Sequence, residues 1–117
     1  MLMIMIRITM RVLIEKQKEL MQTLLSMIKP CAREKGCLSY QVFRDIENRN
    51  ILSLLAEWNT REDLNHHIKS GRFGILLGSR SLLYEPLSIR IHTVSNSEGM
   101  EMVNTLRKKS TLIKTFK

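Results

Sequence analysis

The chain is poor in cysteine, proline and aromatic residues, and each shortage excludes a class of protein. It has two cysteines and two prolines among 117 residues, and aromatic side chains make up 5%. Two cysteines cannot form the disulfide framework of a small secreted domain. Because Cys31 and Cys37 also lack zinc-finger spacing, we expect reduced thiols and no metal site. The 44% hydrophobic content excludes an intrinsically disordered chain.

No apolar run is long enough to cross a membrane. The first residues, "MLMIMIRITMRVLI", are apolar, but Arg7 and Arg11 interrupt them. No basic segment precedes this run and no small-residue cleavage site follows it, so it does not resemble a signal peptide. We therefore expect a cytoplasmic protein with no membrane partner. The length predicts a single domain over residues 1–117.

Acidic residues are scarce, and the excess positive charge is unevenly placed. The chain has 19 Lys and Arg residues against 11 Asp and Glu residues, a net charge of +8. Five of the basic residues and no acidic residue lie within 107–117. Such a tail suits nucleic acid or an anionic membrane surface, or it is the solvated end of a helix. Phe116 is its one aromatic residue, so it offers no surface for stacking bases, and we expect no nucleic-acid partner.

Four segments alternate between apolar and polar side chains, which is typical of β-strands with one buried face. These predicted strands are residues 5–14, 37–45, 51–58 and 87–94. Gly36 supplies the turn into the second of them.

Apolar residues at helical spacing predict helices between these strands. The first covers residues 16–34, and Pro30 should kink or end its last turn. A second helix begins at Thr60, which is placed to cap it, and it is interrupted at Ser70 and Gly71. A further helical stretch runs from about residue 72 to residue 83.

The order of these elements is βαββαβ, followed by a short helix within residues 95–117. This order predicts an α+β, ferredoxin-like fold with a four-stranded antiparallel sheet and helices on one face. The expected strand order is 4-1-3-2, and the core of the domain should span residues 5–94.

The predicted sheet has two different faces. The strongly apolar face, which we expect to carry the helices, consists of Ile6, Ile8, Met10, Leu38, Tyr40, Val42, Leu52, Leu54, Trp58, Ile89 and Ile91. The mixed face suits a sheet that packs on a copy of itself. We therefore predict a homodimer through Arg7, Arg11, Phe43, Leu55, Glu57, Arg90 and His92. Once covered, Glu57 should pair with Arg7 or with Arg90 of the partner subunit, because a buried lone carboxylate is costly.

Several stretches resemble the antibiotic biosynthesis monooxygenase family, which includes small quinol monooxygenases. They are "EKGCLSYQVFRD", "AEW", "LNHHIKSGRF" and a strand after "EP", and the resemblance covers residues 5–94. It implies a dimeric α+β barrel with a ligand cavity between the apolar sheet face and the helices. It also implies that a small aromatic quinol or phenol is oxidised by O₂ without a metal or flavin cofactor.

The candidate catalytic residue is His67, because a histidine exchanges protons near neutral pH and this one faces inward, three residues after Leu64. Its neighbour His66 should face solvent. The residues expected to bind substrate are Trp58, Tyr40, Phe73, Leu54 and Met10. Structural alternatives remain open: Trp58 and Tyr40 also suit core packing, and His67 also suits a buried histidine bonded to the backbone.

Some positions depart from the pattern of the family. Arg72 stands where many relatives carry a second histidine, and Leu54 stands where some monooxygenases carry an asparagine. Met10 and Leu77 replace residues that haem-degrading relatives use, so haem degradation is not expected. The sequence therefore leaves three functions: an oxygenase, a non-catalytic small-ligand-binding or stress-related dimer, and a nucleic-acid or surface-binding module that uses the basic tail.

Overall fold

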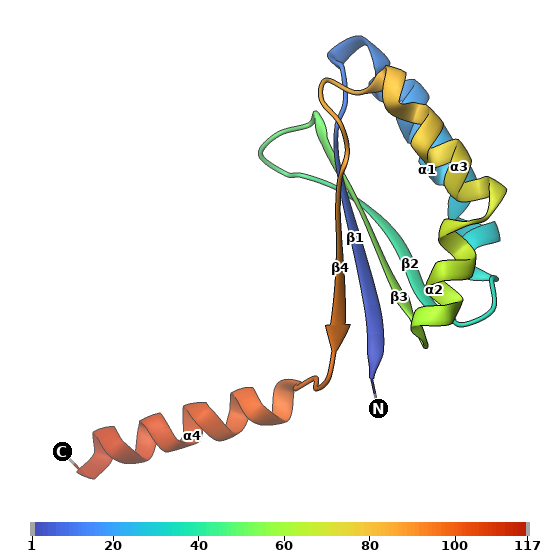
Figure 1. Cartoon of the computed structure of the whole chain (residues 1–117). Helices are drawn as coiled ribbons and strands as arrows, with labels where there is room; N and C mark the ends of the chain where they lie inside the picture. Colours follow the sequence, from blue (N-terminus) through green and yellow to red (C-terminus); the bar gives the residue numbers. More distant parts are fainter. Residues whose placement is uncertain (1, 117) are drawn as a thin grey trace.

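The computed structural model describes residues 2–116, and it describes the side chains of residues 2–109. Its centre is a four-stranded antiparallel sheet in the order β2-β3-β1-β4 (Figure 1). The strands are β1 Met3–Arg11, β2 Cys37–Arg44, β3 Ile51–Trp58 and β4 Ser88–Val94. The predicted α+β, ferredoxin-like topology and its strand order are confirmed.

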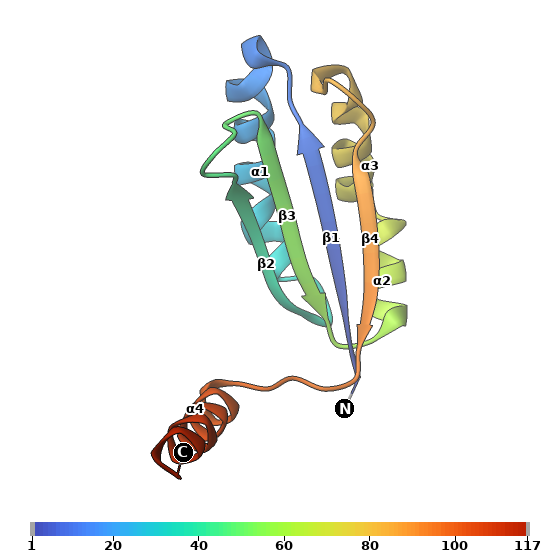
Figure 2. The ribbon, with the colours of Figure 1, turned by 90° about the vertical axis from the view of Figure 1, so that its left-hand side faces the viewer.

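Three helices cover one face of the sheet, and no helix within residues 2–116 covers the other face (Figure 2). They are α1 Gln17–Ala32, α2 Arg61–Ile68 and α3 Gly71–Gly78. Short 3₁₀ helices precede α1, as η1 Ile14–Lys16, and follow α3, as η2 Ser79–Leu82. The last helix, α4 Met100–Phe116, lies beyond the end of the sheet, apart from the other helices (Figure 1).

The predicted basic tail forms part of α4, but the side chains of residues 110–117 lie outside the described part of the chain. No helix among the described residues is long and apolar enough to cross a membrane.

Capping residues fix where α2 and α3 begin. The Thr60 side chain accepts a hydrogen bond from the Asp63 backbone N–H at 3.1 Å, as the sequence predicts. The Ser70 side chain accepts one from the Phe73 backbone N–H at 3.3 Å, so α3 restarts directly after α2. Pro30 is tolerated inside α1, which ends two residues later. These caps hold His67 and Phe73 on the helix side that faces the sheet, where both are buried.

The hydrophobic core lies between the sheet and the three helices. Its fully buried members include Ile6, Ile8, Met10, Leu20, Leu24, Leu54, Trp58, Leu64 and Leu76. The prediction for Leu38 is wrong: it is 54% exposed, and Cys37 packs against the core instead. A β-bulge causes the change, because Cys37 pairs with Trp58 and the register then shifts before Ser39. Ile89, opposite Ile8 on the edge strand β4, is also 40% exposed.

The outer face of the sheet carries the predicted mixture of charged and apolar side chains. The predicted ion pair between Glu57 and Arg7 is absent from the described side chains. Strand register explains this: Arg7 lies opposite Leu55 on one side and Arg90 on the other. Glu57 lies opposite Ser39, whose hydroxyl donates a hydrogen bond to it at 2.6 Å.

The turn between α1 and β2 depends on Gly36. This residue has φ +81°, in the region that favours glycine. A Cβ atom there would lie 2.0 Å from a carboxylate oxygen of Asp63, which belongs to the first turn of α2. The Gly36 carbonyl also accepts a hydrogen bond from the Asn59 backbone N–H at 2.8 Å. The end of α1 is therefore held tightly against the start of α2.

We predict that Gly36→Ala destabilises the protein by at least about 1–2 kcal/mol, because the left-handed backbone conformation is costly for alanine and the Asp63 carboxylate must move. The matched control is Gly74→Ala in the exposed middle of α3, where an added Cβ meets nothing within 4 Å. This control should be stabilising by about 0.5–1 kcal/mol. Urea unfolding measures both changes, and equal effects of the two substitutions would contradict the role given to Gly36.

Candidate functional site

The candidate site is centred on His67, which lies in the last turn of α2 and is 2% exposed. Its imidazole lies against three aromatic rings. The ring centroids are 4.7 Å apart for Trp58, 5.5 Å for Phe73 and 6.0 Å for Tyr40. The structure thus brings together four of the predicted site residues, from β2, β3, α2 and α3. His66 is exposed, as expected.

Glu34 completes the site, and sequence reasoning missed it. Both carboxylate oxygens of Glu34 lie 3.0 Å from the His67 Nδ1 atom, and the Glu34 side chain is only 13% exposed. Arg72 contributes a cation, with its Nη1 atom 3.9 Å from Glu34 Oε2. A carboxylate with so little exposure requires such partners, because the loss of hydration is otherwise uncompensated.

A signal for Glu34 was nevertheless present in the sequence. The residue follows the last turn of α1, where the helix dipole is negative and disfavours a carboxylate. An acidic residue at that position indicates a specific cationic or hydrogen-bonding partner elsewhere. The partner could not be identified from spacing, because His67 is 33 residues away along the chain.

The contact with Glu34 determines how His67 can act. An ionised carboxylate only accepts hydrogen bonds, so the His67 Nδ1 atom must carry the proton that it donates to Glu34. In the neutral imidazole this leaves Nε2 as the basic nitrogen. The carboxylate also stabilises the positive charge that forms when Nε2 takes up a proton. The pair is therefore built to accept and return a proton.

Two buried polar groups beside His67 have no hydrogen-bond partner among the described side chains. They are the Tyr40 hydroxyl and the Trp58 indole N–H, on side chains that are 5% and 0% exposed. Burial, and the nearby Cys31 thiol, raise the pKa of Tyr40 well above its usual range, so the phenol stays protonated as a donor. A buried donor without an acceptor typically costs about 1–3 kcal/mol, which a bound oxygen atom would offset.

The two remaining predicted residues, Leu54 and Met10, belong to the core and are at most 1% exposed. Met10 does not reach the site. Trp58 lies opposite Ile4, six residues before Met10 along β1, which corresponds to roughly 20 Å. The resemblance places Met10 at a first-strand position that haem-degrading relatives use, but the register puts it near the other end of the strand from Trp58. Leu54 lies between the two positions on β3.

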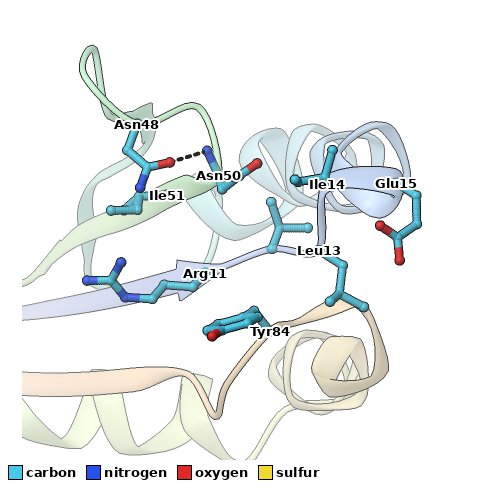
Figure 3. A pocket seen from close by; sticks show the side chains of 9 residues that line it. Arg11, Leu13, Ile14, Glu15, Asn48, Asn50, Ile51 and Tyr84 are labelled. Carbon is cyan, nitrogen blue, oxygen red and sulfur yellow. Dashed lines mark hydrogen bonds between the residues drawn. The ribbon is translucent and has the colours of Figure 1, made fainter.

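Four hollows among the described residues lie apart from His67, and none of these four is lined by His67 or Trp58. One of about 320 Å³ lies at the end of the sheet, between Arg11, Asn48, Asn50 and Tyr84 (Figure 3). Its lining includes no histidine or cysteine, so it offers less acid–base chemistry than the His67 cluster.

Known structures and sequences share this architecture. A conserved protein of Methanosarcina mazei is 33% identical, with a TM-score of 0.74 over 79% of this chain and 92% of that chain. A Mycobacterium tuberculosis protein, 19% identical, has a TM-score of 0.77 over 83% of this chain and 99% of that chain. A crystal structure of an antibiotic biosynthesis monooxygenase, 16% identical, has a TM-score of 0.70 over 82% of this chain and 100% of that chain. The last two show the fold alone.

Sequence comparison gives the family. An uncharacterized protein of Synechocystis is 25% identical over 87 residues, which are 74% of this chain. The chain spans 59% of the length of that curated relative. The family model for antibiotic biosynthesis monooxygenases matches residues 3–74, more than half of the 117 residues, and includes the Glu34–His67 pair and its aromatic neighbours. The chain belongs to the antibiotic biosynthesis monooxygenase family.

Proposed function

We propose that the protein is a monooxygenase that acts on a small hydroxylated aromatic compound, a quinol or a phenol, without a bound cofactor. Membership of the family supports oxygenase chemistry. The observation that carries the finer proposal is the Glu34–His67 pair enclosed by Tyr40, Trp58 and Phe73. An aromatic enclosure suits an aromatic substrate, and the histidine suits removal of a phenolic proton.

In this proposal His67 Nε2 takes the proton of the substrate hydroxyl, while Glu34 stabilises the imidazolium that results. General base catalysis of this kind typically contributes about 10²–10⁴-fold in rate. The phenolate is a better electron donor than the phenol, and it reduces O₂. One oxygen atom enters the product and the other leaves as water, and the substrate supplies the four electrons.

The unpaired donors of Tyr40 and Trp58 have a role in the same proposal. A substrate oxygen placed near His67 would accept hydrogen bonds from the hydroxyl and the indole N–H. Such donors also stabilise the negative charge that develops when the phenolic proton leaves. The interior that surrounds them is apolar, which strengthens these hydrogen bonds relative to water.

A second candidate, a non-catalytic small-ligand-binding dimer, is favoured by a different observation. Arg72 lies beside the Glu34 carboxylate, at the position where many relatives carry a second histidine. Leu54 and Met10 likewise contribute no polar atom to the core. If His67 only orients a ligand, binding would be retained while turnover is absent.

Oxygen consumption with a panel of quinols and hydroxylated aromatics separates these two functions. We expect turnover by the wild type and a loss of about 10²-fold or more in kcat for His67→Ala, because the general base is removed. Glu34→Gln should also lower kcat, because a neutral amide cannot stabilise the imidazolium. His66→Ala, one residue away and exposed, is the matched control and should retain full activity.

Absence of O₂ uptake by the wild type on every compound would contradict the oxygenase proposal. Ligand binding detected by calorimetry in that case would support the binding protein instead. Equal losses in His67→Ala and His66→Ala would contradict the assignment of the base.

We further propose that the outer face of the sheet binds the same face of a second copy. This face contains a hollow of about 470 Å³ lined by residues that include Arg7, Phe43, Leu55 and His92. Phe43 is 47% exposed there, and Arg7 lies directly opposite Arg90, an unfavourable cross-strand pair of like charges. A second copy would cover the apolar surface and supply acidic groups to these arginines.

A cytoplasmic location and the absence of a nucleic-acid partner stay predictions.

Light scattering coupled to size-exclusion chromatography tests the homodimer. We expect the wild type to have the mass of a dimer and Phe43→Arg to have the mass of a monomer, because a further arginine beside Arg7, Arg11 and Arg90 adds charge repulsion. The control is Ile46→Arg in the β2–β3 loop, where the side chain is already 98% exposed. If the wild type and both variants are dimers, the interface lies elsewhere. A monomeric wild type would exclude the homodimer.

A further inference from the structure

Three potential metal ligands meet at the end of α1, although they lie up to 36 positions apart in the chain. The Cys31 Sγ atom, a Glu34 carboxylate oxygen and the His67 Nδ1 atom all lie within 4.8 Å of one another. Cys31 is 0% exposed and His67 is 2% exposed. From this cluster we propose that Cys31, Glu34 and His67 bind one divalent transition-metal ion of the zinc class. An ion on Nδ1 takes the place of the proton that His67 donates to Glu34, so the metal-bound state and the reactive state proposed above exclude each other.

The geometry and the donor types suit such an ion. Zinc binds sulfur at about 2.3 Å and nitrogen or oxygen at about 2.0 Å in a tetrahedral arrangement, which places neighbouring ligand atoms roughly 3–4 Å apart. The Nδ1 and carboxylate oxygens are already 3.0 Å apart. A mixture of sulfur, nitrogen and oxygen favours zinc or cobalt, whereas magnesium and calcium prefer oxygen alone.

The backbone holds the three side chains in place without an ion. The Glu34 N–H donates to the Cys31 carbonyl at 3.1 Å, which fixes these two residues across the end of α1. The close approach of Gly36 to Asp63 then fixes α2, and with it His67, against the same turn. The site would therefore need little rearrangement to bind an ion.

An independent observation is the Tyr40 hydroxyl. Its side chain is 5% exposed, the hydroxyl has no hydrogen-bond partner, and it lies beside the Cys31 thiol. A thiolate formed on metal binding would accept a hydrogen bond from it, as the outer ligands of protein metal sites commonly do.

The charges also balance. A divalent cation displaces the proton of the Cys31 thiol, because the thiolate is the form that binds metal. It also displaces the proton of His67 Nδ1, and the neutral imidazole then carries its proton on Nε2. One thiolate and one carboxylate then neutralise the two positive charges, which avoids burying a net charge. Arg72 contacts Oε2 of Glu34 and leaves Oε1 for the ion.

Titration of the full-length, reduced protein with Co²⁺ tests the site. We expect one equivalent to bind and to give a thiolate-to-cobalt charge-transfer band in the near ultraviolet, which Zn²⁺ then abolishes. Cys31→Ser should lose this band, and Glu34→Gln and His67→Gln should bind Co²⁺ at least about tenfold more weakly. The matched controls are Cys37→Ser and His66→Gln, which alter the other thiol and the adjacent histidine, and both should behave as the wild type does.

The absence of the band in wild-type protein would overturn the proposal. So would a band that persists in Cys31→Ser and disappears in Cys37→Ser. Since Cys31→Ser alters a fully buried side chain, circular dichroism should confirm its fold. X-ray absorption of the zinc-loaded wild type gives a second test that needs no variant: one sulfur at about 2.3 Å supports the site, and a shell of oxygen and nitrogen alone overturns it.

Discussion

The carboxylate of Glu34 is largely removed from water and lies 3.0 Å from the His67 Nδ1 atom, with Arg72 3.9 Å away. Removing an ion from water costs several kcal/mol, so this arrangement is stable only while its partners stay in place. The end of α1 must therefore keep a fixed position relative to α2. Cys31 and the aromatic rings around His67 depend on the same relative position of the two helices.

The relative position of α1 and α2 is set by backbone features more than by the hydrophobic core. Gly36 allows the α1–β2 turn to lie against Asp63, and the Thr60 and Ser70 caps determine where α2 begins and where α3 follows it. A hydrophobic core alone would tolerate a small rotation of α2. The hydrogen bond to Glu34 would not, because its length and direction are restricted.

Periodicity in the sequence was sufficient to predict most of the fold. Alternation predicted all four strands, and their expected order was the usual one of the ferredoxin-like fold that the βαββαβ succession indicates. His67 and Trp58 were expected to converge because one lies on the inner side of a helix and the other on the covered face of the sheet. This part of the site could be predicted, since it depends only on which way each residue faces.

The errors came from features that periodicity does not encode. The bulge at Cys37 exchanged the directions of Cys37 and Leu38, because one extra residue shifts the register. Met10 shares a face with Trp58, but a face does not specify a position along the strand. Glu34 lies in a turn and meets His67 through tertiary packing, so only its unfavourable position after a helix hinted at a partner.

The central claim is that the Glu34–His67 pair is the functional centre, with Nδ1 protonated and Nε2 available. Long-range ¹H–¹⁵N NMR tests it directly, because the chain has only three histidines. The account predicts that the protonated nitrogen of His67 is Nδ1 and that a bound quinol shifts the Nε2 signal of His67, while His66 and His92 stay unchanged. A His67 that carries its proton on Nε2, or that does not respond to a quinol that binds, would contradict the account.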